Sequence, residues 1–253
     1  MTRYFLEFSY FGKPYHGWQI QPNAISVQVV LQAVLSKYLQ APIEVVAAGR
    51  TDSGVHASQM FAHFDWKDAF LDTTYQQGKD FVYRINKMLP KDIALENCHT
   101  VPSQAHARFD AVSRSYQYHI ALKKNPFTTD TAYFLNKPLD IEAMNSACAY
   151  LYEYIDFQCF SKSKTDVKTY NCVITQAYWQ VLDYSIVFHI TADRFLRNMV
   201  RAIVGTLIEI GLGKFPHTHM KTVIESKSRT KAGYSVPAHG LYLTKVVYPN
   251  TVL

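Results

Sequence analysis

The sequence predicts an α/β (α+β) protein built from two tandem ferredoxin-like, or RRM-like, halves, each with the element order βαββαβ and a mostly antiparallel sheet. Apolar residues repeat with strand and helix periods in that order within residues 1–105 and again within residues 106–253. The 253 residues are 48% hydrophobic and 18% charged, which suits one large globular domain or two small ones. Two such sheets side by side are expected to leave a central cleft.

The elements of the first half follow from local patterns. Aromatic and apolar residues from Arg3 to Tyr10 predict a strand, and Ser26 is expected to cap a helix because its hydroxyl accepts from the first free N–H groups. The same periods predict extended runs at 43–48 and 59–65, a helix that carries Phe81, Ile85 and Met88, and a strand at 93–101. The order is therefore βαββαβ.

The second half is expected to repeat this order with one addition. Its predicted elements are a strand at 113–122, a helix capped by Asp140, a hairpin that turns at 182–185, a long helix from Phe195 and a final strand at 240–248. The addition is a short helix at 217–226, placed between the last two elements. The repeat is one of element order and not of residues.

The charge balance favours a polyanionic partner. Lys and Arg number 26 against 20 Asp and Glu, which gives a net charge of +6 and a pI near 9.0. No apolar run reaches the roughly 18 residues of a membrane span, and no signal peptide is evident at the start, so a cytoplasmic location without membrane contact is expected. The histidines lack metal-ligand spacing, so no metal is expected.

The most informative segment for chemistry is the polar, glycine-punctuated run AGRTDSGVHA at 48–57. Glycines on both sides of Arg50, Thr51 and Asp52 allow a tight turn that holds the Asp52 carboxylate at a rim. From spacing alone, a plain hairpin in which Thr51 and Asp52 bond the local backbone remains the alternative.

GRTDSGVHA closely resembles the signature of the tRNA pseudouridine synthase A family, whose GRTD aspartate matches Asp52. The resemblance covers almost the whole chain, through YFGKPYHGWQIQP, HARFDAVSRSYQY, FLRNMVRAIVGTLIEIG and VPAHGLYLTKVVYP. It implies the pseudouridine synthase fold and the isomerisation of uridine to pseudouridine in the anticodon stem-loop of tRNA. Asp52 would be the nucleophile, and no cofactor would be needed, because substrate and product are isomers.

The resemblance also assigns active-site roles to Tyr116, Arg201 and Leu241. Tyr116 would stack on the uracil and move a proton, Arg201 would pair with the catalytic aspartate, and Leu241 would line the base pocket. From the residues alone two alternatives stay open. The tyrosine could pack in the core, and Arg194, Arg197 and Arg201, spaced i, i+3, i+7, could form a solvated helix face.

Several residues are expected to contact the RNA. Arg50 is placed to fill the space of an extruded uridine or to hold a phosphate, and the remaining tRNA contacts by resemblance are His106, Arg108, Phe109, Lys168 and Arg197. Lys168 stands in a segment, 162–168, that departs from the family pattern. The family further implies recognition of tRNA shape and a homodimer.

Other functions remain open at this point. The nearest is a pseudouridine synthase with another RNA target, followed by a non-catalytic tRNA-binding or RNA-folding protein, which the fold and the charge predict equally well. A two-carboxylate glycosidase is disfavoured because no second acid accompanies Asp52 in its motif. The sequence leaves open whether Asp52 attacks C1′ of the ribose or C6 of the base, and whether Tyr116 or the aspartate is the base.

Overall fold

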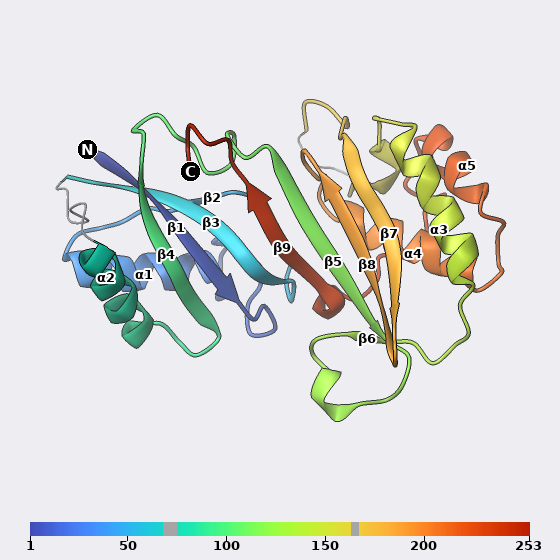
Figure 1. Cartoon of the computed structure of the whole chain (residues 1–253), viewed down its shortest axis with the longest axis horizontal. Coiled ribbons are helices and arrows are strands. Elements are labelled where there is room, and N and C mark those ends of the chain that lie inside the picture. Colours follow the sequence, from blue (N-terminus) through green and yellow to red (C-terminus); the bar gives the residue numbers. More distant parts are fainter. Residues whose placement is uncertain (68–74, 163–166) are drawn as a thin grey trace. The chain divides into compact units, whose positions relative to one another are not determined.

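The computed structural model describes residues 1–67, 75–162 and 167–253 (Figure 1). The chain divides into two compact units, one of Met1–Val112 with Leu243–Leu253 and one of Ser113–Tyr242. Each unit combines helices with mostly antiparallel strands, so the predicted α/β fold class is confirmed. The units differ from the expected ranges because the C-terminal residues return to the first unit and the division lies after Val112.

The first unit has the predicted order βαββαβ. Its elements are β1 (Thr2–Tyr10), α1 (Val27–Leu39), β2 (Val46–Ala47), β3 (His56–Trp66), α2 (Tyr75–Met88) and β4 (Ile93–Val101). The strands run in the order β4, β1, β3, all antiparallel, and β2 pairs with β3. The part of β9 that belongs to this unit also lies beside β3, where Ser58 Oγ donates to the Leu243 carbonyl.

Local chemistry explains where these elements start and stop. Ser26 caps α1 as predicted, since its side chain accepts from the Val29 N–H (3.3 Å). The helix ends at Gln40, which has a left-handed φ of 54°. β3 begins earlier than predicted because Ala57 pairs with Tyr10 across the sheet. β2 is shorter than predicted because only Val46 and Ala47 pair with β3.

The strand β1 has buried aromatic residues on both faces. Tyr4 and Phe8 belong to the face on which Tyr4 stacks with Phe64. Phe5 points to the other face, where Tyr248 from the C-terminal segment packs edge-on against it at 5.2 Å. The C-terminal segment therefore completes the core of the first unit.

The second unit contains the remaining elements. They are β5 (Ser113–Ala121), η1 (Pro126–Thr128), β6 (Tyr133–Phe134), α3 (Ile141–Ala149), η2 (Tyr150–Tyr152), η3 (Gln158–Phe160), β7 (Ile174–Leu182), β8 (Ser185–Ala192), α4 (Met199–Gly211), α5 (His219–Ser226), η4 (Ala238–Gly240) and the first residues of β9 (Leu241–Val247). The sheet order is β5, β8, β7, with β6 parallel to β5. The helices α3, α4 and α5 gather on one side of these strands (Figure 1).

The helix predicted from Phe195 begins only at Met199, so this prediction is wrong by one turn. Asn198 adopts a left-handed φ of 67°, which a right-handed helix does not accept, and the chain before it is irregular. Arg194 and Arg197 therefore precede α4, and only Arg201 lies on it. The helix α4 is buried on almost every side.

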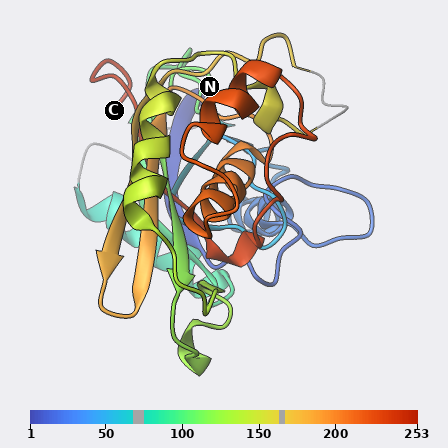
Figure 2. The ribbon, with the colours of Figure 1, turned by 90° about the vertical axis from the view of Figure 1, so that its right-hand side faces the viewer.

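An excursion between β5 and α3 was not predicted from the sequence. This excursion, residues 122–134, leaves the end of β5 (Figure 1, Figure 2), includes η1, and returns as β6, which pairs with the end of β5. In the described part of the chain, no helix is both long and apolar enough to cross a bilayer.

Candidate active site

Asp52 lies in a tight turn between β2 and β3. The Val55 N–H donates to the Asp52 carbonyl (3.1 Å), and Gly54 has a φ of 79° that favours glycine. Asp52 is half-buried, Arg50 is exposed, and both belong to the first unit. The predicted placement of the carboxylate at a rim therefore agrees with its partial burial.

The segment from Tyr10 to Trp18 is hydrogen-bonded to this turn. The Tyr10 hydroxyl bonds Thr51 Oγ1 (2.8 Å), and the Trp18 N–H donates to the Thr51 carbonyl (3.3 Å). The Tyr15 carbonyl accepts from the Gly54 N–H (3.3 Å) and from Ser53 Oγ (3.3 Å). Bonds from three residues of one segment therefore fix the residues on either side of Asp52.

Two further contacts lock that segment in place. The Tyr15 hydroxyl donates to Asp92 Oδ1 (2.6 Å), and burial, reinforced by this bond, raises the pKa of Tyr15 well above its usual range. Gly17 has a φ of 81° and passes so close to the Thr51 carbonyl that a Cβ would lie 2.4 Å from its oxygen. No larger residue fits at Gly17 without moving the Asp52 loop.

His56, which follows the motif, is a buried structural residue. Its Nδ1 accepts from the Gly12 N–H (2.9 Å), and its ring stacks on Phe11 at 4.7 Å. The acceptor role requires Nδ1 to be unprotonated, so the ring proton is on Nε2. His56 thus joins the start of β3 to the same supporting segment.

Tyr116 and Tyr118 point to the same side of β5 and differ in burial. Tyr118 is fully buried in the core, and its hydroxyl donates to the Pro237 carbonyl (2.8 Å). Tyr116 is half-buried, opposite Ile190, and meets Phe195 edge-on at 5.1 Å. Its ring is therefore held by an aromatic contact while part of it remains accessible.

Arg201 is oriented by the chain that crosses α4. Its Nε donates to the Val236 carbonyl (2.7 Å), and the Val236 N–H donates to the Arg201 carbonyl (3.3 Å). The crossing is close, because a Cβ on Gly205 would lie 1.8 Å from the Tyr234 carbonyl oxygen. These contacts fix the plane of the guanidinium.

The predicted residues fall into two groups. Leu241 follows η4 at the start of β9, is 6% exposed, and lies in the second unit with Tyr116 and Arg201. Asp52 and Arg50 lie in the first unit. Each group is thus assembled within its own unit.

The predicted RNA-contact residues His106, Arg108 and Phe109 form one compact loop in the first unit. His106 Nδ1 accepts from the Arg108 N–H (3.1 Å) and the Phe109 N–H (3.3 Å), and the His106 N–H donates to Asp110 (2.7 Å). Phe109 is 74% exposed, and the Arg108 guanidinium lies 5.7 Å from the centre of its ring. The loop presents an aromatic ring and a cation together.

Sequence reasoning missed the residue that anchors this loop. His63 of β3 is buried, accepts from the Ala107 N–H through Nδ1 (3.1 Å), and meets the His106 ring edge-on at 4.7 Å. Burial and the nearby charge of Arg3 lower the pKa of His63 to about 4. No local pattern could reveal this role, since His63 lies far from the loop in sequence.

Arg197 and Lys168 are exposed residues of the second unit. The Arg197 carbonyl accepts from the Lys162 N–H (3.0 Å), which joins the start of the 162–168 segment to the chain before α4. Residues 163–166 of that segment lie outside the described part of the chain. Within the described ranges, no group of three or more His, Cys, Asp or Glu side chains could hold a metal ion.

Known proteins resemble this chain along its whole length. A family model described as tRNA pseudouridine synthase matches residues 149–249. The tRNA pseudouridine synthase A of Parabacteroides distasonis is 51% identical over 250 residues, which cover 99% of this chain and 97% of that protein. The protein of the same name from Porphyromonas gingivalis is 50% identical (99% and 98% covered), and that from Francisella tularensis is 37% identical (99% and 95% covered).

Proposed function

The chain belongs to the tRNA pseudouridine synthase A family, and on this basis we propose that it isomerises uridine to pseudouridine in tRNA with Asp52 as its nucleophile. The reaction breaks the bond between C1′ and N1, turns the uracil and joins C1′ to C5, while the C5 proton leaves and N1 gains one. Atoms and electrons balance within the substrate, so the proposed reaction draws on no redox partner. The supporting observation is a half-buried carboxylate on a turn that the neighbouring segment holds rigidly.

Arg201 is the proposed partner of Asp52 in the active enzyme. A guanidinium beside a carboxylate keeps the carboxylate ionised, as a nucleophile must be, and fixes its orientation. The bond from Nε to the Val236 carbonyl fixes the plane of the guanidinium, and a planar guanidinium matches the geometry of a carboxylate. Arg201 would then hold Asp52 ready for attack at C1′ of the ribose or C6 of the base.

Tyr116 and Leu241 are proposed to hold the uracil. Tyr116 has a half-buried ring supported by Phe195, which suits stacking on a base, and its hydroxyl is the candidate to move the C5 proton. The buried Leu241 would form the apolar wall of the same pocket. The Asp52 carboxylate itself is the other candidate base.

The proposed substrate is the anticodon arm of tRNA, bound by a homodimer in the cytoplasm. A paired or stacked uridine must be extruded before a carboxylate reaches it, and Arg50 is proposed to fill the vacated space or hold a phosphate. Further out, the proposed contacts are His106, Arg108, Phe109, Lys168 and Arg197. The exposed Phe109 ring and its arginine suit an unpaired base, and the net charge of +6 suits the phosphates.

The first experiment maps pseudouridine in unmodified tRNA after incubation with the purified protein. Wild type should modify anticodon-arm uridines, whereas Asp52→Asn and Asp52→Ala should bind tRNA and lose the activity about 10⁴-fold or more. Asp183→Asn, in the exposed β7–β8 turn, removes the same charge far along the sequence from the motif and should keep the activity. Arg201→Lys should also lose most activity, since a point charge does not replace the planar fork.

Two outcomes would contradict the proposal. Tight tRNA binding by a wild-type protein that changes no uridine would favour the non-catalytic RNA-binding function. Pseudouridine that appears only in another RNA would keep the chemistry and overturn the anticodon-arm assignment.

A further inference from the structure

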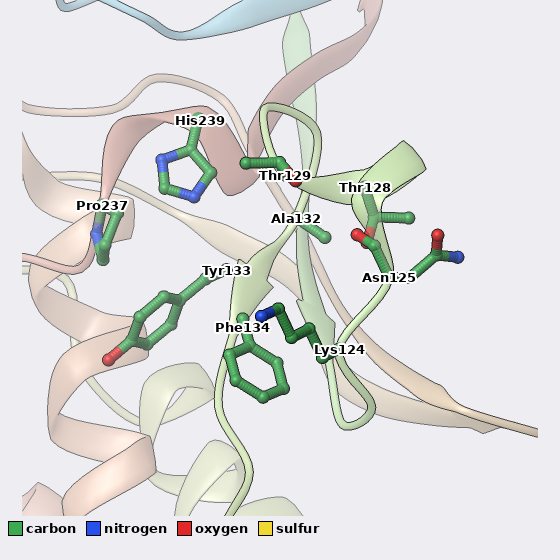
Figure 3. Close-up of a pocket in the computed structure, with 9 residues that line it drawn as sticks. All are labelled: Lys124, Asn125, Thr128, Thr129, Ala132, Tyr133, Phe134, Pro237 and His239. Carbon is green, nitrogen blue, oxygen red and sulfur yellow. The ribbon is translucent and has the colours of Figure 1, made fainter.

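The second unit has a pocket beside the segment that orients Arg201. Its volume is about 320 Å³, within the range of small-ligand sites, and Figure 3 shows nine residues around it. The walls come from the excursion between β5 and α3 and from the chain at 237–239. No residue predicted from the sequence to contact substrate or RNA is among the nine.

The excursion that forms most of this pocket is internally bonded. Asn125 Oδ1 accepts from the Phe127 N–H (2.9 Å), and Thr128 Oγ1 donates to the Asn125 carbonyl (3.1 Å). Tyr133 pairs with Ile120 of β5, and the Tyr242 hydroxyl donates to the Thr131 carbonyl (2.9 Å). A ligand would therefore meet a preformed wall, which lowers the entropy cost of binding.

The chemistry of the pocket suits a nucleotide. Figure 3 shows the rings of Tyr133, Phe134 and His239 and the side chain of Lys124 among the residues that line the pocket. Phe134 is 45% exposed, so part of its side chain is accessible to a ligand. Among the described residues that line the pocket, none is acidic. Rings beside a cation bind the base and the phosphate of single-stranded nucleic acid.

The pocket is tied to the proposed active site through one short segment. Val236 holds Arg201 Nε through its carbonyl, Pro237 accepts from Tyr118 and lines the pocket, and Leu241 follows soon after. We propose that the pocket holds a nucleotide of the tRNA next to the target uridine, with its base on Phe134 and its phosphate at Lys124. This inference rests on the proposed function, because it requires the uridine to reach Arg201 and Leu241.

The test measures the dissociation constant of unmodified tRNA and the KM for pseudouridine formation. Lys124→Ala and Phe134→Ala should each raise both by about fivefold and keep kcat. Lys123→Ala is a matched control, because it removes the same charge one residue away while its ammonium lies over the Tyr184 ring (5.1 Å). Phe127→Ala is the second control, because the Phe127 ring belongs to the same excursion, is 90% exposed and does not line the pocket. Both controls should behave as wild type.

Two results would overturn the inference. One is equal tRNA affinity in the pocket variants and their controls. The other is that the pocket variants differ from wild type only in their inhibition by uridine 5′-monophosphate and keep the wild-type tRNA affinity. The pocket would then be a site for a free nucleotide. Because affinity is measured separately from turnover, a wild-type protein that binds tRNA without modifying it would refute the proposed function and still test the pocket.

Discussion

Tyr15 connects the Asp52 turn to the loop before β4. Its backbone carbonyl accepts two bonds from the turn, and its side-chain hydroxyl donates to Asp92, so one residue spans both segments. We expect Tyr15→Phe to lower the free energy of unfolding by about 1–2 kcal/mol, because a part-buried bond to a carboxylate is lost. It should also lower kcat about tenfold by loosening the nucleophile.

Urea unfolding and steady-state kinetics at a temperature where the variant is folded check both parts. Tyr83→Phe serves as the control, since Tyr83 is 63% exposed on α2, and it should change neither quantity. A loss of stability with unchanged kcat would show that Tyr15 supports the fold without positioning Asp52.

His63 makes the loop of His106, Arg108 and Phe109 sensitive to acid. Its pKa is lowered to about 4 in the folded protein, chiefly by burial, so between about pH 6.5 and 4 the unfolded chain binds a proton that the folded protein does not. Stability must therefore fall as the pH drops through this window. Asn at position 63 keeps an acceptor for the Ala107 N–H and removes the titration.

Unfolding free energies measured across that window test the role of His63. The His63→Asn variant should show a slope against pH that is smaller by up to one proton, or about 1.4 kcal/mol per pH unit. His106, whose pKa is also lowered by burial, should keep part of the slope in the variant. Identical slopes for the two proteins would refute the assignment.

Helix α4 depends on a glycine for the contact that orients Arg201. Because a Cβ at position 205 would lie 1.8 Å from the Tyr234 carbonyl oxygen, Gly205→Ala must push the 233–237 segment away from the helix. We expect a loss of about 1–3 kcal/mol in unfolding free energy, as for other overpacked sites. Activity should fall further than stability explains, because the Val236 carbonyl moves away from Arg201.

Thermal unfolding and kcat of the Gly205→Ala variant check this prediction. If the variant keeps a normal kcat at a temperature where it is fully folded, the crossing segment is not needed to orient Arg201.

Elements with their own capping and periodic signals were predicted well. Ser26 and Asp140 cap α1 and α3, the latter through a bond from the Ala143 N–H (2.8 Å), and the hairpin turns between Leu182 and Ser185 as expected. The start of α4 was predicted wrongly. The apolar spacing begins at Phe195, but the left-handed φ of Asn198 keeps residues 195–198 out of the helix. The two-residue strand β6 exists only through its pairing with β5, which no local signal encodes.

At the scale of the whole molecule, two halves and their element order were predicted from the sequence. Residues 243–253 were assigned to the second half, whereas their contacts place them in the first unit. Chain order suggested that residues 243–253 belong with the half before them. The core of the first unit decides otherwise, since Tyr248 packs on Phe5 and Phe61 and donates to the Ala107 carbonyl (2.6 Å). Asp52, Tyr116 and Arg201 were predicted by family resemblance, whereas Tyr15 beside the Asp52 turn, Phe195 beside Tyr116 and Val236 beside Arg201 became visible only in three dimensions.

The return of the C-terminal segment has a consequence for synthesis on the ribosome. Residues 243–253 emerge after Ser113–Tyr242, yet they complete the unit that contains Met1–Val112. Ser113–Tyr242 has all of its own residues before that moment, so the second unit can finish folding while the first still lacks its last strand and Tyr248. The order of completion is therefore the reverse of the order of translation, and a nascent chain that stalls before residue 243 carries the Asp52 turn on an unfinished support.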